Sequence, residues 1–167
     1  MKQIILLNGP SSSGKSTLAK SLQKLLLDKE NLQYDIVSID DFMKISTSET
    51  IYEDDVFEIS QDMCNEIISL LNKSDGVIVD HVITSKRIFE QFIRSTKTYK
   101  TFLVHVTCPL DVLIQREEER GDRCLGSAKN SFDYLYPKDG YDLEVDTYTL
   151  SKEECALKIY NYLLIIT

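Results

Sequence analysis

The sequence predicts a three-layer α/β fold: a mostly parallel, five-stranded sheet with helices on both faces and a lid segment at one end. Short apolar runs, each as long as a buried strand, alternate with longer segments in which apolar residues recur at every third or fourth position. Strands that alternate with helices in this way form a parallel sheet with both faces covered. The chain has 167 residues, which suits one domain with a sizeable core and is too few for two ordinary domains. We therefore expect a single domain over residues 1–167.

The first half of the chain is expected to supply three strands and two helices. The strands are short apolar runs, and the third of them follows an Asp75-Gly76 turn. The helices are indicated by apolar residues on one face, such as Leu18 and Leu22 in the first of them. In order, these elements are a strand at 4–7, a helix at 15–29, a strand at 35–39, a helix at 56–71 and a strand at 76–79.

The second half continues the alternation. Pro109 suits the first turn of a helix, and Ser151 with Glu154 has the spacing of a capping box before the last helix. The polar stretches 41–55 and 121–142 show no periodicity, and loops of this length in a compact domain are usually functional. The remaining elements are a helix at 85–94, a strand at 102–106, a helix at 109–120, a short strand at 143–145 and a final helix after residue 151.

A phosphate-binding motif follows the first predicted strand and opens the first predicted helix. The letters GPSSSGKST match the pattern G-x-x-x-x-G-K-[ST], in which backbone N–H groups and the helix N-terminus cradle phosphate oxygens. Lys15 is expected to reach the β- and γ-phosphates of a bound nucleotide, and the Ser16 hydroxyl is expected to bind Mg²⁺. The residues expected to bind the nucleotide are Gly9, Pro10, Ser11, Ser12, Ser13, Gly14, Lys15, Ser16 and Thr17, with Arg116 from a later helix.

Carboxylates end two other predicted strands, where a parallel sheet places its ligands. Asp80 has the position of a Walker-B aspartate, which would hold Mg²⁺ directly or through water. Asp40 and Asp41 end the second strand, and a carboxylate beside the phosphate loop can accept the proton of an attacking hydroxyl. Neighbouring side chains on an extended chain point to opposite sides, so only one of the two should face the site. We favour Asp40 as the catalytic base.

Three arginines surround the end of the predicted helix at 109–120. Arg116 and Arg120 share a helix face, and Arg123 follows the Gly121 break. Planar guanidinium groups suit the charge of a transferring phosphoryl group, so Arg120 and Arg123 join Lys15 and Asp40 as expected catalytic residues. The glutamates between the arginines are expected on the outer face, and the lid is expected over about 116–142.

The amino-acid composition limits the kinds of molecule that the protein is expected to bind. With 19 Lys and Arg against 27 Asp and Glu, the net charge is −8, which argues against a protein that coats nucleic acid or an anionic membrane. No apolar stretch approaches the ~20 residues of a membrane span. The four cysteines form no C-x-x-C pair, so we expect no zinc cluster and a cytoplasmic location.

A GTP-dependent switch is a weaker alternative. Residues 72–75 spell the N-K-x-D guanine signature, but they precede a predicted strand, whereas the signature follows one in GTPases. No D-x-x-G follows the third strand, and a polar turn is the favoured interpretation.

In combination, these motifs resemble the chloramphenicol phosphotransferase-like proteins. The resemblance rests on LNGPSSSGKS at 7–16, Ile39-Asp40, RGDR at 120–123, YDLEVDT at 141–147 and ECA at 154–156. These proteins are small P-loop kinases that use ATP and Mg²⁺, and the founding activity phosphorylates a hydroxyl of chloramphenicol.

The resemblance implies roles for individual positions. It implies that Asp40 is the base, that Lys15 and Ser16 act in the phosphate loop, and that Arg116, Arg120 and Arg123 are lid arginines. It also implies that Asp146 and Thr147 end the last strand near the adenine. The chain departs from the family at two points: Asp80-His81 replaces a pair of aspartates, and Ser131 and Tyr136 replace a glutamine and a histidine.

We therefore expect an ATP-dependent phosphotransferase that moves the γ-phosphate to a hydroxyl of a small molecule, resembling chloramphenicol 3-O-phosphotransferase. One alternative is a nucleoside or polynucleotide 5′-hydroxyl kinase, although the acidic segment 49–66 disfavours a polynucleotide. The other is a non-catalytic nucleotide-binding regulator, which would not need Asp40. Four aromatic residues are candidates to wall the acceptor site: Tyr52, Phe57, Tyr134 and Tyr136.

Overall fold

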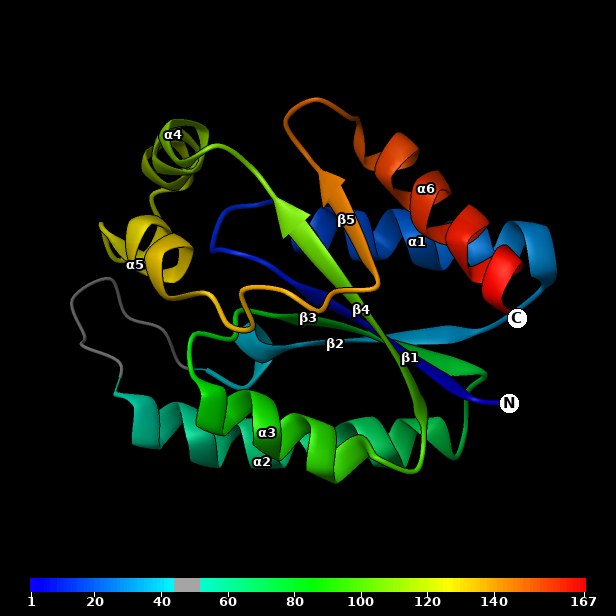
Figure 1. Cartoon of the computed structure of the whole chain (residues 1–167). Coiled ribbons are helices and arrows are strands. Elements are labelled where there is room, and N and C mark those ends of the chain that lie inside the picture. The colour runs from blue at the N-terminus through cyan, green and yellow to red at the C-terminus, as the bar shows by residue number, and fades with distance from the viewer. Residues whose placement is uncertain (44–51) are drawn as a thin grey trace.

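The centre of the molecule is a five-stranded sheet in the order β2-β3-β1-β4-β5, and every pair of neighbouring strands is parallel (Figure 1). The computed structural model describes residues 1–43 and 52–167. The fold class predicted from the sequence is confirmed. The strands are β1 Gln3–Asn8, β2 Tyr34–Ser38, β3 Gly76–His81, β4 Lys100–Thr107 and β5 Leu143–Asp146.

Helices cover both faces of this sheet (Figure 1). One pair, α1 and α6, packs on one face, and the pair α2 and α3 packs on the other, while α4 and α5 lie beyond the carboxyl ends of the strands. A short 3₁₀ turn, η1 Ile39–Asp41, follows β2. The helices are α1 Lys15–Glu30, α2 Glu53–Leu71, α3 Lys86–Thr96, α4 Leu110–Arg120, α5 Ser127–Tyr134 and α6 Lys152–Ile166.

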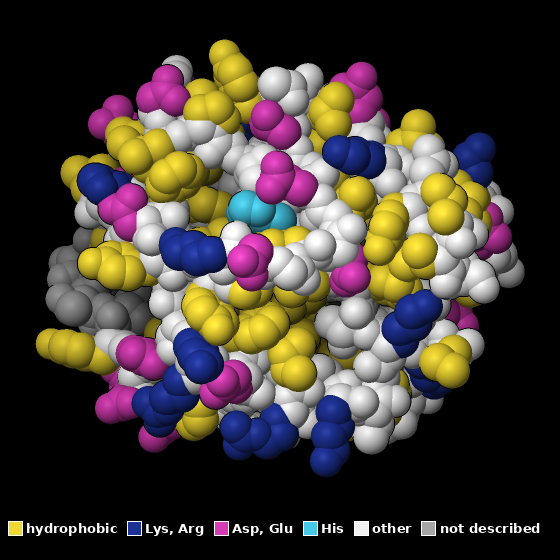
Figure 2. All heavy atoms as spheres, viewed as in Figure 1, with side chains coloured by type: hydrophobic (Ala, Val, Ile, Leu, Met, Phe, Trp, Pro, Cys, Tyr) yellow, Lys and Arg dark blue, Asp and Glu magenta, His cyan; other side chains and the backbone are white. Residues whose placement is uncertain are grey.

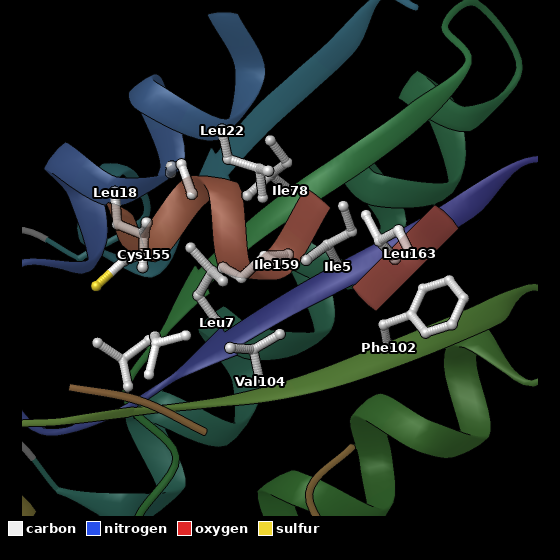
Figure 3. Close-up of a cluster of buried hydrophobic side chains, with 14 of the residues drawn as sticks. Ile5, Leu7, Leu18, Leu22, Ile78, Phe102, Val104, Cys155, Ile159 and Leu163 are labelled. Carbon is white, nitrogen blue, oxygen red and sulfur yellow. The ribbon is translucent and has the colours of Figure 1, made fainter. Parts of the chain in front are cut away.

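The central strand β1 is apolar on both faces because both faces are covered. Ile5 and Leu7 pack with residues of α1 and α6, as Figure 3 shows, whereas Ile4 and Leu6 pack toward α2 and α3. All four of these side chains are fully buried. Burial of one such side chain is worth roughly 1.5–3 kcal/mol, so β1 holds both helical layers in place. The loop that leaves β1 is therefore anchored at its first residue.

The loop predictions need correction at two places. The stretch 121–142 contains the helix α5, and the stretch 41–55 contains the first turn of α2, which begins at Glu53. Asp54 and Asp55 follow Glu53, and acidic residues in a first turn favour a helix N-terminus. The rest of that stretch, residues 44–51, lies outside the described part of the chain. The predicted capping box at Ser151 is present at the start of α6.

Candidate active site

The phosphate-binding loop turns sharply between β1 and α1. Gly14 has a φ of 85° and Ser12 has a φ of 69°, which is the left-handed region. A side chain at Gly9 would meet the carbonyl oxygen of Val106 on the neighbouring strand β4. Helix α1 begins directly after Gly14, so its free N–H groups point toward the loop. This geometry leaves the concave side of the loop lined by backbone donors.

Lys15, the first residue of α1, lies buried against this loop. Its Nζ donates to the carbonyl oxygen of Pro10 at 2.7 Å and to Ser13 Oγ at 3.3 Å. Burial lowers the pKa of the Lys15 ammonium, and the charges of Asp80 and Asp40 oppose that change. Within the described part of the chain, the Lys15 ammonium bonds to two neutral oxygens and to no carboxylate. It is therefore available to an anionic ligand, because phosphate oxygens would replace these neutral contacts with charged ones.

Ser16 and Asp80 form an oxygen-rich pair below the loop. Ser16 Oγ donates to Asp80 Oδ2 at 2.5 Å, and Ser38 Oγ donates to the same oxygen at 3.3 Å. Mg²⁺ prefers oxygen ligands and usually takes one or two from protein, with the others from water and phosphate. Among residues 1–43 and 52–167 there is no group of three or more acidic, His or Cys side chains that would hold a metal ion alone. The Ser16–Asp80 pair therefore fits Mg²⁺ that arrives with a nucleotide.

Arg116 ties α4 to the phosphate loop and to the end of β5. Its Nη1 donates to the carbonyl oxygen of Ser12 at 3.4 Å and to Thr147 Oγ1 at 3.3 Å, and its Nη2 donates to the Thr147 carbonyl oxygen at 3.2 Å. Thr147 Oγ1 in turn donates to the carbonyl oxygen of Ser13 at 2.7 Å. Arg116 and Thr147, which are distant from the loop in sequence, thus stabilise the loop through its carbonyl oxygens.

Asp40 lies at the opposite side of the loop, paired with an arginine. Arg123 Nη2 donates to Asp40 Oδ2 at 2.5 Å, whereas Arg120 bonds to the exposed Asp122 at 3.2 Å. The reason we gave for preferring Asp40 was wrong, because Asp40 and Asp41 lie in the 3₁₀ turn η1 and not on an extended strand. The side chain of Asp40 nevertheless lines the site, and Asp41 is exposed.

Two cavities meet at Asp40. The first, the P-loop cavity, has a volume of about 650 Å³ and is lined by Lys15, Ser16, Asp80 and the three arginines. The other, the second cavity, has a volume of about 520 Å³ and lies between η1, α2, α3 and α5. Both volumes lie in the range of small-molecule sites. The residues that line both cavities are Ser11, Ile39, Asp40, Val82 and Arg123.

The glutamates of α4 do not all face outward as predicted. Glu117 is buried, with its two carboxylate oxygens accepting hydrogen bonds from the backbone N–H groups of Gly126 at 3.1 Å and Ala128 at 2.8 Å. These groups begin α5, so Glu117 caps that helix from another element. No local pattern signals this contact, because the partners are nine and eleven residues apart in sequence.

Asn8 is a further residue that sequence reasoning missed. It ends β1, is fully buried, and accepts a hydrogen bond from the N–H of Ile83 at 2.9 Å. Its Nδ2 donates to the carbonyl oxygen of Tyr136 and to the hydroxyl of Tyr141, both at 2.9 Å. A similar link joins the Ser11 N–H to Ser131 Oγ at 2.9 Å. Asn8 could have been found from the sequence because it is a polar residue at the end of an otherwise apolar central strand.

The aromatic residues expected around the acceptor line neither cavity. Tyr52 and Tyr134 are exposed, Tyr136 packs edge-on against Phe89 at a centroid distance of 5.7 Å, and the guanidinium of Arg87 covers Phe57 at 3.9 Å. The apolar lining of the second cavity is aliphatic instead. The direction of these side chains depends on how their helices are oriented, and the spacing of the aromatic residues in the sequence did not reveal that orientation.

The N-K-x-D stretch at 72–75 lies far from the phosphate loop. It forms the turn between α2 and β3, where Asp75 Oδ2 accepts from the N–H of Gln33 at 2.7 Å. The turn precedes β3, and the phosphate loop follows β1, so the two lie at opposite ends of neighbouring parallel strands. The stretch is a polar turn.

Comparisons with known proteins agree with this geometry. The model of the family described as chloramphenicol phosphotransferase-like protein matches residues 2–163, which confirms the resemblance found in the sequence. A comparison with proteins of curated function found no match. Within the described residues, no helix is long and apolar enough to cross a membrane.

Solved structures share the fold at low sequence identity. The APS kinase CysC of Mycobacterium tuberculosis, solved with AMPPNP and APS, has a TM-score of 0.78 and 17% identity over 97% of both chains. A gluconokinase of Sinorhizobium meliloti has a TM-score of 0.75 and 16% identity over 99% of this chain and 93% of its own. Shikimate kinase of Acinetobacter baumannii, solved with shikimate, has a TM-score of 0.69 and 19% identity over 100% of this chain and 96% of its own. The fold is that of P-loop kinases.

Proposed function

The chain belongs to the chloramphenicol phosphotransferase-like family, and we propose that it is an ATP-dependent kinase that phosphorylates a hydroxyl group of a small molecule. Family and fold together support a phosphotransferase in general. The proposal of a small-molecule acceptor rests on one observation: two cavities meet at Asp40 and Arg123. One cavity suits the phosphates of ATP, the other suits an acceptor, and a carboxylate stands where they join.

Each group of site residues has its own role in the proposed reaction. The P-loop amides and Lys15 bind the β- and γ-phosphates, and Arg120 and Arg123 add positive charge where the phosphoryl group transfers. The oxygen of the acceptor hydroxyl bonds to the γ-phosphorus while Asp40 accepts the hydroxyl proton. The bond between the γ-phosphorus and the β-phosphate oxygen breaks in the same step. Mg²⁺, held by Ser16 and Asp80, would neutralise charge on the phosphate oxygens when it is bound. Segment 116–142 acts as a lid that keeps water from the γ-phosphate.

The charges on the face shown in Figure 2 favour a small acceptor over a polynucleotide. Figure 2 shows acidic and basic side chains interspersed over the face in view, without a continuous basic stripe. A polynucleotide would need such a stripe to offset a net charge of −8. A non-catalytic regulator would not need a second cavity beside Asp40. We place the reaction in the cytoplasm, where ATP and reduced cysteines coexist, and chloramphenicol is the first acceptor to test for a role in antibiotic resistance.

The test is an ATP-consumption screen over antibiotics, nucleosides and sugars, with Asp40→Asn and its neighbour Asp41→Asn as matched variants. Asp40→Asn is expected to lower phosphoryl transfer by about 10²–10⁴-fold while AMPPNP still binds. Asp41→Asn, which alters an exposed carboxylate, should behave as the parent does. Undiminished transfer by Asp40→Asn would overturn the assignment of the base, and the absence of any phosphorylated acceptor would favour the regulator.

A further inference from the structure

The second cavity is lined by aliphatic side chains and by short polar side chains. The aliphatic lining residues lie in or next to η1, α2, β3 and α3, namely Ile39, Met43, Val56, Val82 and Ile88. The short polar lining residues come from the phosphate loop, the start of α3 and α5, namely Ser11, Thr84, Ser85, Ser127, Asn130 and Ser131. A ligand that fills this cavity is amphipathic, because an apolar face and several hydrogen-bonding groups must be matched at once.

Among the described residues, the charged side chains that line the second cavity include one carboxylate without a cationic partner. The described lining contains Asp40, Glu53 and Arg123, and Arg123 is already paired with Asp40. Glu53 Oε1 accepts a hydrogen bond from Ser85 Oγ at 2.6 Å, but within residues 1–43 and 52–167 Glu53 makes no ion pair.

The cation beside Glu53 is directed elsewhere. Arg87, in the first turn of α3, pairs with Asp54 at 2.6 Å and covers the ring of Phe57 at 3.9 Å. Both contacts hold Arg87 on α2, and it does not line the second cavity. Among the described residues, the charged side chains that line the cavity are therefore one ion pair and one carboxylate with no cationic side chain paired to it, and this balance favours a cationic ligand and repels an anionic one.

We propose, building on the proposed kinase function, that the acceptor is an amphipathic amino alcohol whose ammonium group binds Glu53 while its hydroxyl group lies at Asp40. The aliphatic lining residues contact the apolar part of the molecule, and the serines and Asn130 bond to its remaining polar groups. Glu53 is then a specificity-determining residue, because it distinguishes an amine from an amide or a carboxylate on the same scaffold.

The experiment measures binding to the complex with AMPPNP, so it does not depend on turnover. The probes share one scaffold with the same two hydroxyls: p-nitrophenylserinol as the free amine, its neutral N-acetyl amide and its anionic N-succinyl amide. Calorimetry on the parent is expected to rank the amine first and the succinyl amide last. Glu53→Gln is expected to lower the ratio of amine to N-acetyl affinity by about fivefold, which is the size of a partly exposed ion pair. Glu53→Lys is expected to place the succinyl amide first.

Asp55→Asn is the matched control. Asp55 is also in the first turn of α2 but does not line the second cavity, so this variant keeps the parental ratio. The proposal is overturned if the succinyl amide binds best to the parent, if none of the three binds, or if Glu53→Gln keeps the parental ratio. Failure of the kinase function is a separate result, since it appears as an absence of phosphorylated product in the wide acceptor screen while the binding order persists.

Discussion

The guanidinium group of Arg123 bonds to the carboxylate of Asp40 at 2.5 Å, although 83 residues separate them in the chain. The arginine side chain is 14% exposed and the aspartate side chain 38% exposed, so the pair is partly shielded from water. Asp40 lies in η1 directly after β2, and Arg123 follows α4, so one partner is in the turn that leaves the sheet and the other is on the proposed lid. The contact joins these two parts at the point where both cavities meet.

Replacement of Arg123 by Gln should slow phosphoryl transfer far more than it weakens nucleotide binding. In the proposed reaction this arginine orients Asp40 and supplies charge to the transferring group, and an arginine in that role is worth about 10³-fold or more in kcat. Arg123→Lys should restore little, because an ammonium group lacks the planar pair of donors. The measurements are acceptor phosphorylation and the affinity for AMPPNP. Arg94→Gln, on the exposed side of α3, serves as the control. An equal loss of rate and nucleotide affinity would contradict a role in the transfer step.

Replacement of Asp80 by Asn should raise the Mg²⁺ concentration needed for nucleotide binding. Asp80 accepts hydrogen bonds from both Ser16 and Ser38, so it orients the hydroxyl that would bind the metal as well as supplying its own charge. Loss of such a group typically weakens a metal site by roughly 10–100-fold. Titration of AMPPNP binding with Mg²⁺ measures the change, and Asp62→Asn on exposed α2 should show none. Equal Mg²⁺ dependence in parent and variant would remove Asp80 from the metal site.

Replacement of Asn8 by Ala should destabilise the whole domain. The variant leaves the buried N–H of Ile83 and the carbonyl oxygen of Tyr136 without their partner, at a cost of about 2–4 kcal/mol. For a chain of this length, that cost lowers the melting temperature by roughly 4–16 °C. Thermal unfolding followed by circular dichroism measures it. Asn65→Ala, which removes only an exposed contact with Gln61, should melt close to the parent. A melting temperature unchanged by Asn8→Ala would show that the network adds no stability.

The buried His81 should make the protein sensitive to acid. Burial, with a smaller contribution from the charge of Lys15, lowers the pKa of His81 to about 3, from its ordinary 6.5. Above pH 6.5 the histidine is neutral in both states and the stability is complete. As the pH falls below 6.5, only the unfolded chain binds the proton, so the free energy of unfolding falls by up to about 1.4 kcal/mol per pH unit until about pH 3.

Urea unfolding between pH 7 and pH 4 tests this dependence. His81→Asn keeps an acceptor for the N–H of Val82 but does not titrate, so its slope with pH should be shallower. His105→Asn removes the other histidine and leaves His81 in place, and should keep the steep slope. Parallel slopes in the parent and His81→Asn would contradict the assignment.

Local sequence patterns predicted most of the fold and the position of the phosphate loop within it. The apolar run of β1 and the leucines of α1 bracket the phosphate loop, so the position of Lys15 and Ser16 followed from their neighbours in the chain. The pairing of Ser16 with Asp80 could also be anticipated, because parallel strands end at one edge of the sheet. In both cases the side chains are placed by strands and helices, and the spacing of apolar residues along the sequence predicts those elements.

The sequence by itself determined the order of the elements, the phosphate loop and the family. Only the tertiary structure decided which partners the remaining polar side chains have. Glu117 turns inward to cap α5, Arg123 pairs with Asp40, and Glu53 lines the second cavity with no ion pair among the described residues. The physical reason is that a side chain's direction follows from how its helix packs against others. Packing is a property of the assembled core, and a short stretch of sequence does not contain it.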